Sequence, residues 1–420
     1  MRGDVRSDLI LAAVLIPPYF VWRLHQCVLV VEGRPASALP ATGALPPLIY
    51  RALPAASALP PIPDTIDPVT SGSVPLIIDC DTGIDDGLAL LYACASPEAE
   101  IVAVTCTAGN VDARQVAENT RAVLELAGRT DVEVALGREV PVLRELVTTP
   151  ETHGPRGIGW AELPPPTMPL SPRHSADLIV QEARRRPGEI TLVTLAPLTN
   201  VALAVLREPE LPRLLGRLVI MGGTYRAPGN TTPVSEWNIH VDPEAAQIVF
   251  RAWASAIGRD ASVPRALALG LDVTELAKLL PEHFASLGRR AGTDGAALEA
   301  RVRSADGPVP ANPVLRYLAD SLRFYMEFHE RYDRFYGAFI HDPLVVSVAL
   351  DAELARATPV AVDVEADGEV AAGQTVADWR GLWQRTPNAD VAVEADVDAF
   401  LDRLVDRLGG LAARAAGVAS

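Results

Sequence analysis

Four aspartates lie within eight residues, at Asp79, Asp81, Asp85 and Asp86. The apolar run 76–78 directly before them predicts a buried strand, and the residues from Asp85 onward predict a helix. This order places carboxylates at the carboxyl end of a strand, where open α/β sheets bind ligands. Carboxylates gathered without a nearby lysine or arginine repel one another unless a hard divalent cation lies among them. The spacing therefore predicts a metal site.

Helix capping is a simpler explanation of the same aspartates. Aspartate is favoured at a helix N-terminus because it accepts backbone hydrogen bonds and interacts well with the helix dipole. Capping accounts for one or two of the four carboxylates. It does not account for Asp79 and Asp81, which precede the turn at Thr82 and Gly83. We therefore favour the metal-site interpretation.

Composition indicates a globular protein. The chain has 420 residues, of which 49% are hydrophobic and 21% charged, so it can bury the core of one large α/β domain or two smaller ones. The formal net charge of -16 and the lack of any basic run argue against a nucleic-acid partner. The cysteines show no paired or metal-type spacing, which predicts reduced thiols in a cytoplasmic protein; they are Cys27, Cys80, Cys94 and Cys106.

Residues 1–73 differ in composition from the rest and are interpreted as a leader and linker. The apolar segment Leu9–Trp22 resembles a signal peptide or short anchor, which would make the protein exported or anchored. Two prolines interrupt it, however, and it is shorter than a spanning helix, so we do not expect a membrane protein. Residues 34–73 have a linker composition that predicts disorder. A third interpretation is a start site placed too early, with Val74 as the true beginning.

From Val74 the chain alternates predicted strands and helices. This alternation is typical of an α/β fold with a mostly parallel open sheet and helices on both faces. Residues 275–336 lack strand patterning and predict a mainly helical insertion. The predicted strands are 76–78, 101–107, 132–136, 190–195 and 217–221, followed by short strands within 358–392; the predicted helices are 113–126, 175–186, 201–207, one opening at 243, and 397–408.

Five motifs, in order along the chain, resemble the inosine-uridine preferring nucleoside hydrolases. They are Asp79–Asp86, Ala108–Asn110, Leu195–Asn200, Met221 with Asn230 and Glu236–Asn238, and His341–Pro343. The resemblance implies a nucleoside hydrolase-like catalytic domain over residues 74–410 with the insertion at about 275–336. It also implies Ca²⁺-dependent hydrolysis of the N-glycosidic bond of ribonucleosides, and a homodimer or homotetramer.

The reaction explains why such residues are needed. Hydrolysis of an N-glycosidic bond passes through an oxocarbenium-like sugar, so the site must activate water, hold the ribose and help the base leave. Ca²⁺ accepts carboxylate and carbonyl oxygens at high coordination number and leaves room for a water and a diol.

The resemblance also implies a role for each site residue. The metal ligands would be Asp81, which would also be the general base, Asp86, the main-chain carbonyl of Leu195, and Asp342. The substrate contacts would be Asp85 to the ribose 2-hydroxyl, Asn110 and Asn238 beside the water and diol, Met221 under the sugar, and Asn230 with Glu236 at the 5-hydroxyl. His341 and His153 are the candidates for protonating the leaving base.

Several of these residues have a structural alternative. Asn110 could be only a turn residue, Glu236 and Asn238 could lie in a solvated loop, and Met221 could be core. His341 could be structural. The loop around His153 could be a mobile flap over the base or a surface turn. The chain departs from the family pattern at two places: Leu195-Ala196 leaves the geometry of the carbonyl-ligand turn open, and Pro155-Arg156 leaves the choice between purine and pyrimidine bases open.

Two other functions use the same aspartates. Asp79-Cys-Asp81-Thr is close to the nucleophile motif of haloacid dehalogenase-type phosphatases, which also need a lysine. Lys278 is the only lysine and falls in the predicted helical insertion. A non-catalytic nucleoside- or sugar-binding protein is the second alternative.

Overall fold

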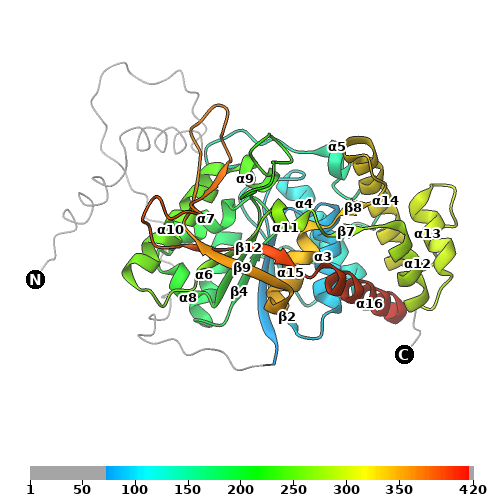
Figure 1. Cartoon of the computed structure of the whole chain (residues 1–420). Helices are drawn as coiled ribbons and strands as arrows, with labels where there is room; N and C mark the ends of the chain where they lie inside the picture. The colour runs from blue at the N-terminus through cyan, green and yellow to red at the C-terminus, as the bar shows by residue number, and fades with distance from the viewer. Residues whose placement is uncertain (1–71, 416–420) are drawn as a thin grey trace, which may run out of the picture. The chain divides into compact units, whose positions relative to one another are not determined.

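The computed structural model describes residues 72–415, so the expectations for residues 1–71 lie outside the described residues. Its centre is an eight-stranded sheet with strand order β3-β2-β1-β4-β5-β6-β12-β9 (Figure 1). All neighbouring pairs are parallel except β12 with β9. The strands are β1 (Val74–Cys80), β2 (Ala99–Cys106), β3 (Glu133–Leu136), β4 (Thr191–Thr194), β5 (Arg217–Met221), β6 (Ala266–Leu269), β9 (Ala355–Val360) and β12 (Ala389–Ala395). The predicted mostly parallel open sheet is confirmed.

Helices cover both faces of this sheet, as predicted. Leu76 and Ile78 of β1 pack into one hydrophobic core and Ile77 into another, because successive side chains of a strand point to opposite faces. Figure 1 shows the two groups of helices on either side of the sheet. The helices that contribute side chains to the first core include α3 (Ile84–Ala95), α4 (Ala113–Leu126), α15 (His341–Leu350) and α16 (Val397–Ala415). Those that contribute to the second core include α6 (Ser175–Arg185), α7 (Thr199–Arg207) and α10 (Pro243–Arg259).

The predicted insertion is mainly helical but not free of strands. It contains α12 (Pro281–Arg290), α13 (Gly295–Arg303) and α14 (Pro313–Asp333). The expectation of no strand is wrong at β7 (Lys278–Leu279), which pairs antiparallel with β8 (Ala338–Phe339). Two residues are too few to produce a recognisable alternation of polar and apolar side chains.

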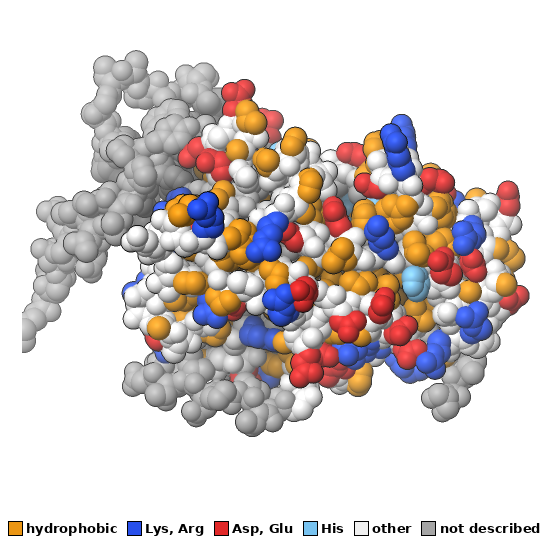
Figure 2. Space-filling model, viewed as in Figure 1, with side chains coloured by type: hydrophobic (Ala, Val, Ile, Leu, Met, Phe, Trp, Pro, Cys, Tyr) orange, Lys and Arg blue, Asp and Glu red, His pale blue; other side chains and the backbone are white. Residues whose placement is uncertain are grey.

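Short elements complete the described chain. They are α5 (Pro150–His153), α8 (Leu211–Leu214), α9 (Trp237–Val241), α11 (Leu271–Thr274), a 3-10 turn at Ala352–Leu354, and a hairpin of β10 (Val362–Val364) and β11 (Thr375–Ala377). Within residues 72–415, no helix has both the length and the apolar character needed to cross a bilayer. Acidic and basic side chains are interspersed on the face shown in Figure 2.

The strand order reverses at β1. From β1 the chain continues outward through β2 and β3 on one side, whereas β4, β5 and β6 follow on the other side. Asp79 of β1 is in register with Thr105 of β2 and with Thr194 of β4. The carboxyl ends of these strands therefore meet at a topological switch point, where open sheets form a ligand-binding crevice.

Candidate active site

A cavity of about 550 Å³ is lined by residues that follow these strand ends. Its volume is in the range of pockets that hold small molecules. Most of the predicted site residues line it, and they are Asp85, Asn110, His153, Leu195, Met221, Asn230, Glu236, Asn238, His341 and Asp342. The other two, Asp81 and Asp86, are fully buried and hydrogen-bonded to the cavity residue Asn110.

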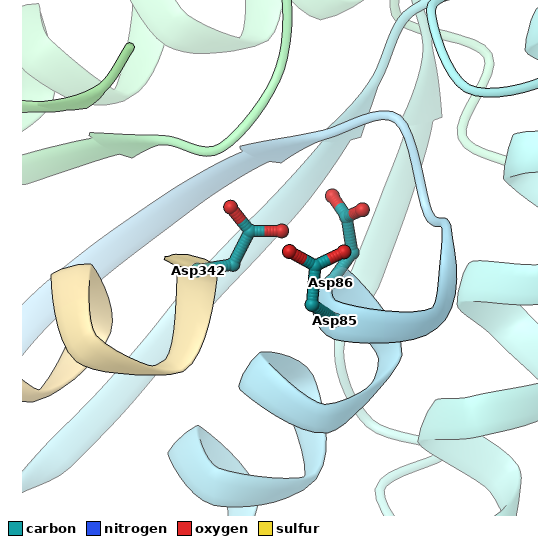
Figure 3. Close-up of side chains that lie close together, drawn as sticks. All are labelled: Asp85, Asp86 and Asp342. Atoms are coloured by element: carbon teal, nitrogen blue, oxygen red, sulfur yellow. The ribbon is translucent and has the colours of Figure 1, made fainter. Parts of the chain in front are cut away.

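Three carboxylates converge beside this cavity. Asp85, Asp86 and Asp342 each offer an oxygen, and these oxygens lie within 4.8 Å of one another. Figure 3 shows Asp342 pointing from the start of α15 toward Asp85 and Asp86 in the first turn of α3. Two helix N-termini thus meet here, and each stabilises negative charge. The trio contains Asp85, which the resemblance assigns to ribose binding, and does not contain Asp81.

Only one of the two carboxylate oxygens of Asp81 accepts a hydrogen bond within the described part of the chain. Its Oδ2 accepts a hydrogen bond of 2.8 Å from the backbone N–H of Asn110. Its Oδ1 is buried and finds no hydrogen-bond partner among the described residues. Leaving a buried polar atom unsatisfied costs roughly 1–3 kcal/mol, and more for a charged group. This oxygen is therefore suited to a ligand such as a cation or a water.

The carboxylate of Asp86 accepts three hydrogen bonds. Its Oδ1 accepts from the backbone N–H of Asp81 at 3.2 Å, and its Oδ2 accepts from the N–H of Gly83 at 2.8 Å and from Nδ2 of Asn110 at 3.2 Å. Asn110 thus contacts both aspartates, so it is more than a turn residue.

The carboxylates are electrostatically uncompensated by protein cations. Burial raises the pKa of Asp81 and Asp342 well above the usual range, that of Asp85 to about 8 and that of Asp86 to about 6. Neighbouring carboxylates add to the rise for Asp81, Asp85 and Asp342. Among the described residues that line the cavity there is no lysine or arginine. A donor set of oxygens with this excess negative charge fits a hard divalent cation.

Leu195 lines the cavity directly after β4. Asn238 orients this part of the wall, because its Nδ2 donates to the carbonyl oxygens of Leu195 at 2.9 Å and Met221 at 3.3 Å. Met221 lines the cavity and is also a member of the first core. The main-chain oxygen of Leu195 therefore contacts a side chain that lines the cavity.

Glu236 is not in a solvated loop, and neither is Asn238; both side chains are buried. Glu236 caps α9, since its carboxylate accepts from the backbone N–H groups of Asn238 and Ile239. It also accepts from the N–H of Gly223 at 2.9 Å. Asn230 is exposed at the rim and accepts from the N–H of Trp237 at 3.1 Å.

The two predicted histidines are buried and neutral. His153 lies at the end of α5 and is buried, and its Nδ1 accepts from the backbone N–H of Ile84 at 3.1 Å, whereas Pro155 and Arg156 of the same loop form an exposed turn. His341 forms a hydrogen bond of 2.9 Å between Nδ1 and Oγ1 of Thr274. Burial lowers the pKa of both imidazoles to about 3. Each can donate one N–H but carries no extra proton at neutral pH.

The sequence pointed to the wall formed by α14 and β8 only through Tyr332, Tyr336 and the neighbouring aromatics, as a second choice for the acid that protonates the base. Its members include the adjacent aromatic and titratable side chains Tyr325, Phe328, His329, Tyr332, Asp333 and Phe339, and Glu275 lies beside them. The aromatic residues within 324–336 could have indicated this cavity wall in the sequence. Their helical spacing, however, is equally typical of a helix packed in a core.

The comparisons with known proteins decide the family. The profile described as "Inosine-uridine preferring nucleoside hydrolase" matches residues 76–402. This chain belongs to that family.

Curated nucleoside hydrolases and solved structures agree with this assignment. The chain is 37% identical over 347 residues to the pyrimidine-specific ribonucleoside hydrolase RihA of Enterobacter sp. strain 638, covering 81% of this chain and 100% of that protein. It is 36% identical to RihA of Escherichia coli K12, covering 80% and 98%. The solved purine-preferring ribonucleoside hydrolase of Gardnerella vaginalis has a TM-score of 0.70 and 31% identity, covering 81% and 99%.

Family membership makes the chain a hydrolase that acts on N-glycosyl compounds. The phosphatase alternative is wrong. Lys278 lies in β7 rather than a helix, is exposed, and places its Nζ 5.1 Å from the ring centroid of Phe335.

Proposed function

We propose that this protein hydrolyses the N-glycosidic bond of ribonucleosides to free base and ribose, using a Ca²⁺ ion. The observation that carries the proposal is the cluster of Asp85, Asp86 and Asp342 with the unsatisfied Oδ1 of Asp81 at a nucleoside-sized cavity. A polar floor of acidic oxygens suits a sugar with a vicinal diol better than it suits an apolar ligand.

The proposed ligands of the ion are Asp81, Asp86, the carbonyl oxygen of Leu195, and Asp342. All of these donors are oxygens, which Ca²⁺ prefers, and they come from three separate segments of the chain. When bound, the ion supplies positive charge that fixes the ribose diol and makes a nearby water more acidic.

Asp81 is the proposed general base. The Asn110 N–H fixes Oδ2, so the free Oδ1 is left to accept a proton from the attacking water. Burial raises the affinity of this carboxylate for a proton, which favours transfer in that direction.

The proposed sugar contacts are side chains that line the cavity around the aspartate cluster. We assign Asp85 to the 2-hydroxyl, Asn110 and Asn238 to the water and diol, Met221 to the underside of the ring, and Asn230 with Glu236 to the 5-hydroxyl. All of them line the cavity. The ionised carboxylates also stabilise the positive charge that develops on the sugar in the transition state.

His341 and His153 are assigned to the leaving base. Both line the cavity, and Nε2 of His153 carries its hydrogen because Nδ1 accepts from Ile84. An N–H directed at the base stabilises negative charge as the glycosidic bond breaks.

The remaining parts of the proposal concern the whole protein. We propose a cytoplasmic homodimer or homotetramer with no nucleic-acid partner. The described cysteines Cys80, Cys94 and Cys106 are free thiols, which supports a reducing compartment.

Product analysis with Asp81→Asn tests the proposal. In phosphate-free buffer, wild type should release base and free ribose in equal amounts, and Asp81→Asn should lose ~10²–10⁴-fold of this activity. Asp402→Asn, at an exposed position of α16, is the matched control and should match wild type. Absence of ribose release by wild type, or a near-normal rate for Asp81→Asn, would contradict the proposal.

A further inference from the structure

His329 of α14 lines the far wall of the cavity and is almost completely buried, with 3% of its surface exposed. Its Nδ1 lies 2.8 Å from the carbonyl oxygen of Tyr325, one helical turn earlier. A carbonyl oxygen can only accept, so the hydrogen must be on Nδ1. In the neutral imidazole the other ring atom, Nε2, is then a hydrogen-bond acceptor.

The imidazole is neutral and cannot easily turn. Burial lowers the pKa of His329 to about 4. Four aromatic rings surround it, with centroid distances of 4.4 Å to Tyr325, 5.0 Å to Phe339, 5.3 Å to Phe328 and 5.6 Å to Phe335. Within residues 72–415, Nε2 makes no hydrogen bond. The cavity is therefore bordered by a fixed acceptor that a ligand can satisfy.

Further acceptors lie at the same end of the cavity. Glu275 and Asp333 both line it, and burial, together with the charge of Asp333, raises the pKa of Glu275. Lys278 partly offsets the charge of both carboxylates. His153, by contrast, contributes an N–H through Nε2. The wall around His329 thus offers acceptors on His329, Glu275 and Asp333, the hydroxyl groups of Tyr325 and Tyr332 in the same wall can donate or accept, and His153 donates an N–H.

We propose that His329 determines base preference and selects nucleosides whose base carries an exocyclic amino group. An amino N–H can donate to Nε2, whereas a carbonyl oxygen at the same ring position would face its lone pair. Cytidine and adenosine are therefore favoured over their keto counterparts uridine and inosine. This inference rests on the proposed function and gives a preference different from that in the family's description.

The test compares kcat/KM for these four nucleosides in wild type and His329→Phe. Phenylalanine keeps a ring in the aromatic cluster and removes Nε2. We expect the amino-to-keto ratio to fall by about 10-fold in His329→Phe, the effect of roughly one hydrogen bond. Differences in leaving-group reactivity cancel, because the same substrate pairs are compared in both enzymes. His283→Phe, outside the cavity, is the control and should keep the wild-type ratio.

An unchanged or increased ratio in His329→Phe would overturn the inference. If that variant does not fold, Glu275→Gln is the second test. It adds an amide N–H to the same wall, so the amino-to-keto ratio of kcat/KM should fall in favour of uridine and inosine. An unchanged ratio in Glu275→Gln would then overturn it. Failure of wild type to hydrolyse any of the four nucleosides would instead refute the proposed function.

Discussion

Gly109 lies where no side chain fits. It is in the loop between β2 and α4, and a Cβ atom at this position would be 2.0 Å from Oδ2 of Asp81 and 2.9 Å from Cδ of Pro197. Carbon and oxygen atoms in contact normally lie roughly 3.3–3.6 Å apart. Gly109→Ala must therefore displace the Asp81 carboxylate or the loop by about 1 Å.

Both activity and stability should fall. A misplacement of about 1 Å at a reacting group costs on the order of 10²-fold in rate. Overpacking a close-packed site typically costs ~1–3 kcal/mol of unfolding free energy. The hydrogen bond from the Asn110 N–H to Oδ2 of Asp81 lies in the same place and should be lost with the displacement. We thus expect kcat to fall by about 10²-fold while the protein still folds.

Gly258→Ala is the matched control. Gly258 lies in α10 with open space around its Cβ position, so alanine should raise the unfolding free energy by roughly 0.5–1 kcal/mol and leave kcat unchanged. Urea unfolding and nucleoside hydrolysis measured on both variants separate the two effects. A Gly109→Ala enzyme with wild-type kcat would refute the placement of Asp81 described above.

Three other predictions concern the histidine and the cation. His341→Ala should slow natural nucleosides more than a riboside with an activated aryl leaving group, because only the former need help to leave; equal slowing would make His341 a positioning residue for Asp342. Asp342→Asn should weaken Ca²⁺ binding in calorimetry, and unaltered affinity would remove Asp342 from the ligand set. The folded-state pKa values of Asp85 and Asp86 are raised by burial from 3.8 to about 8 and about 6, so without metal their protonated forms stabilise the fold at acidic pH, and this stability is lost as pH rises from about 4 through those two values. The Ca²⁺-induced rise in Tm should accordingly grow over that pH interval, and a flat or falling difference would contradict the cluster's role.

The sequence was sufficient for the parts of the fold with strong periodicity. The predicted helix at 113–126 has the same ends in the structure, because its apolar positions are regularly spaced and Asp112 caps it. The residues at the carboxyl ends of β1, β2 and β4 could also be predicted to meet, since parallel strands end at one edge of the sheet.

Other elements carried no periodic signal. All residues of α15 except Leu350 are buried, so this helix has no polar face to mark it. Strand β6 has only four residues and was not recognised.

The cavity wall at His329 could not be predicted for a different reason. Its acceptor character depends on a hydrogen bond from Nδ1 to the Tyr325 carbonyl and on the packing of rings from α14 and β8. Those contacts exist only in the folded protein. Likewise, the sequence spacing of Asp81 and Asp85 does not reveal which of them comes within 4.8 Å of Asp86 and Asp342.

Free ribose release before and after metal removal shows whether hydrolysis depends on a cation bound at the aspartate cluster. The full-length enzyme, treated with chelator and dialysed, should release no ribose from a panel of nucleosides, and added Ca²⁺ should restore the original rate. Full activity in the chelated enzyme, with metal analysis showing less than one ion per chain, would contradict the account of a cation held by Asp81, Asp86 and Asp342.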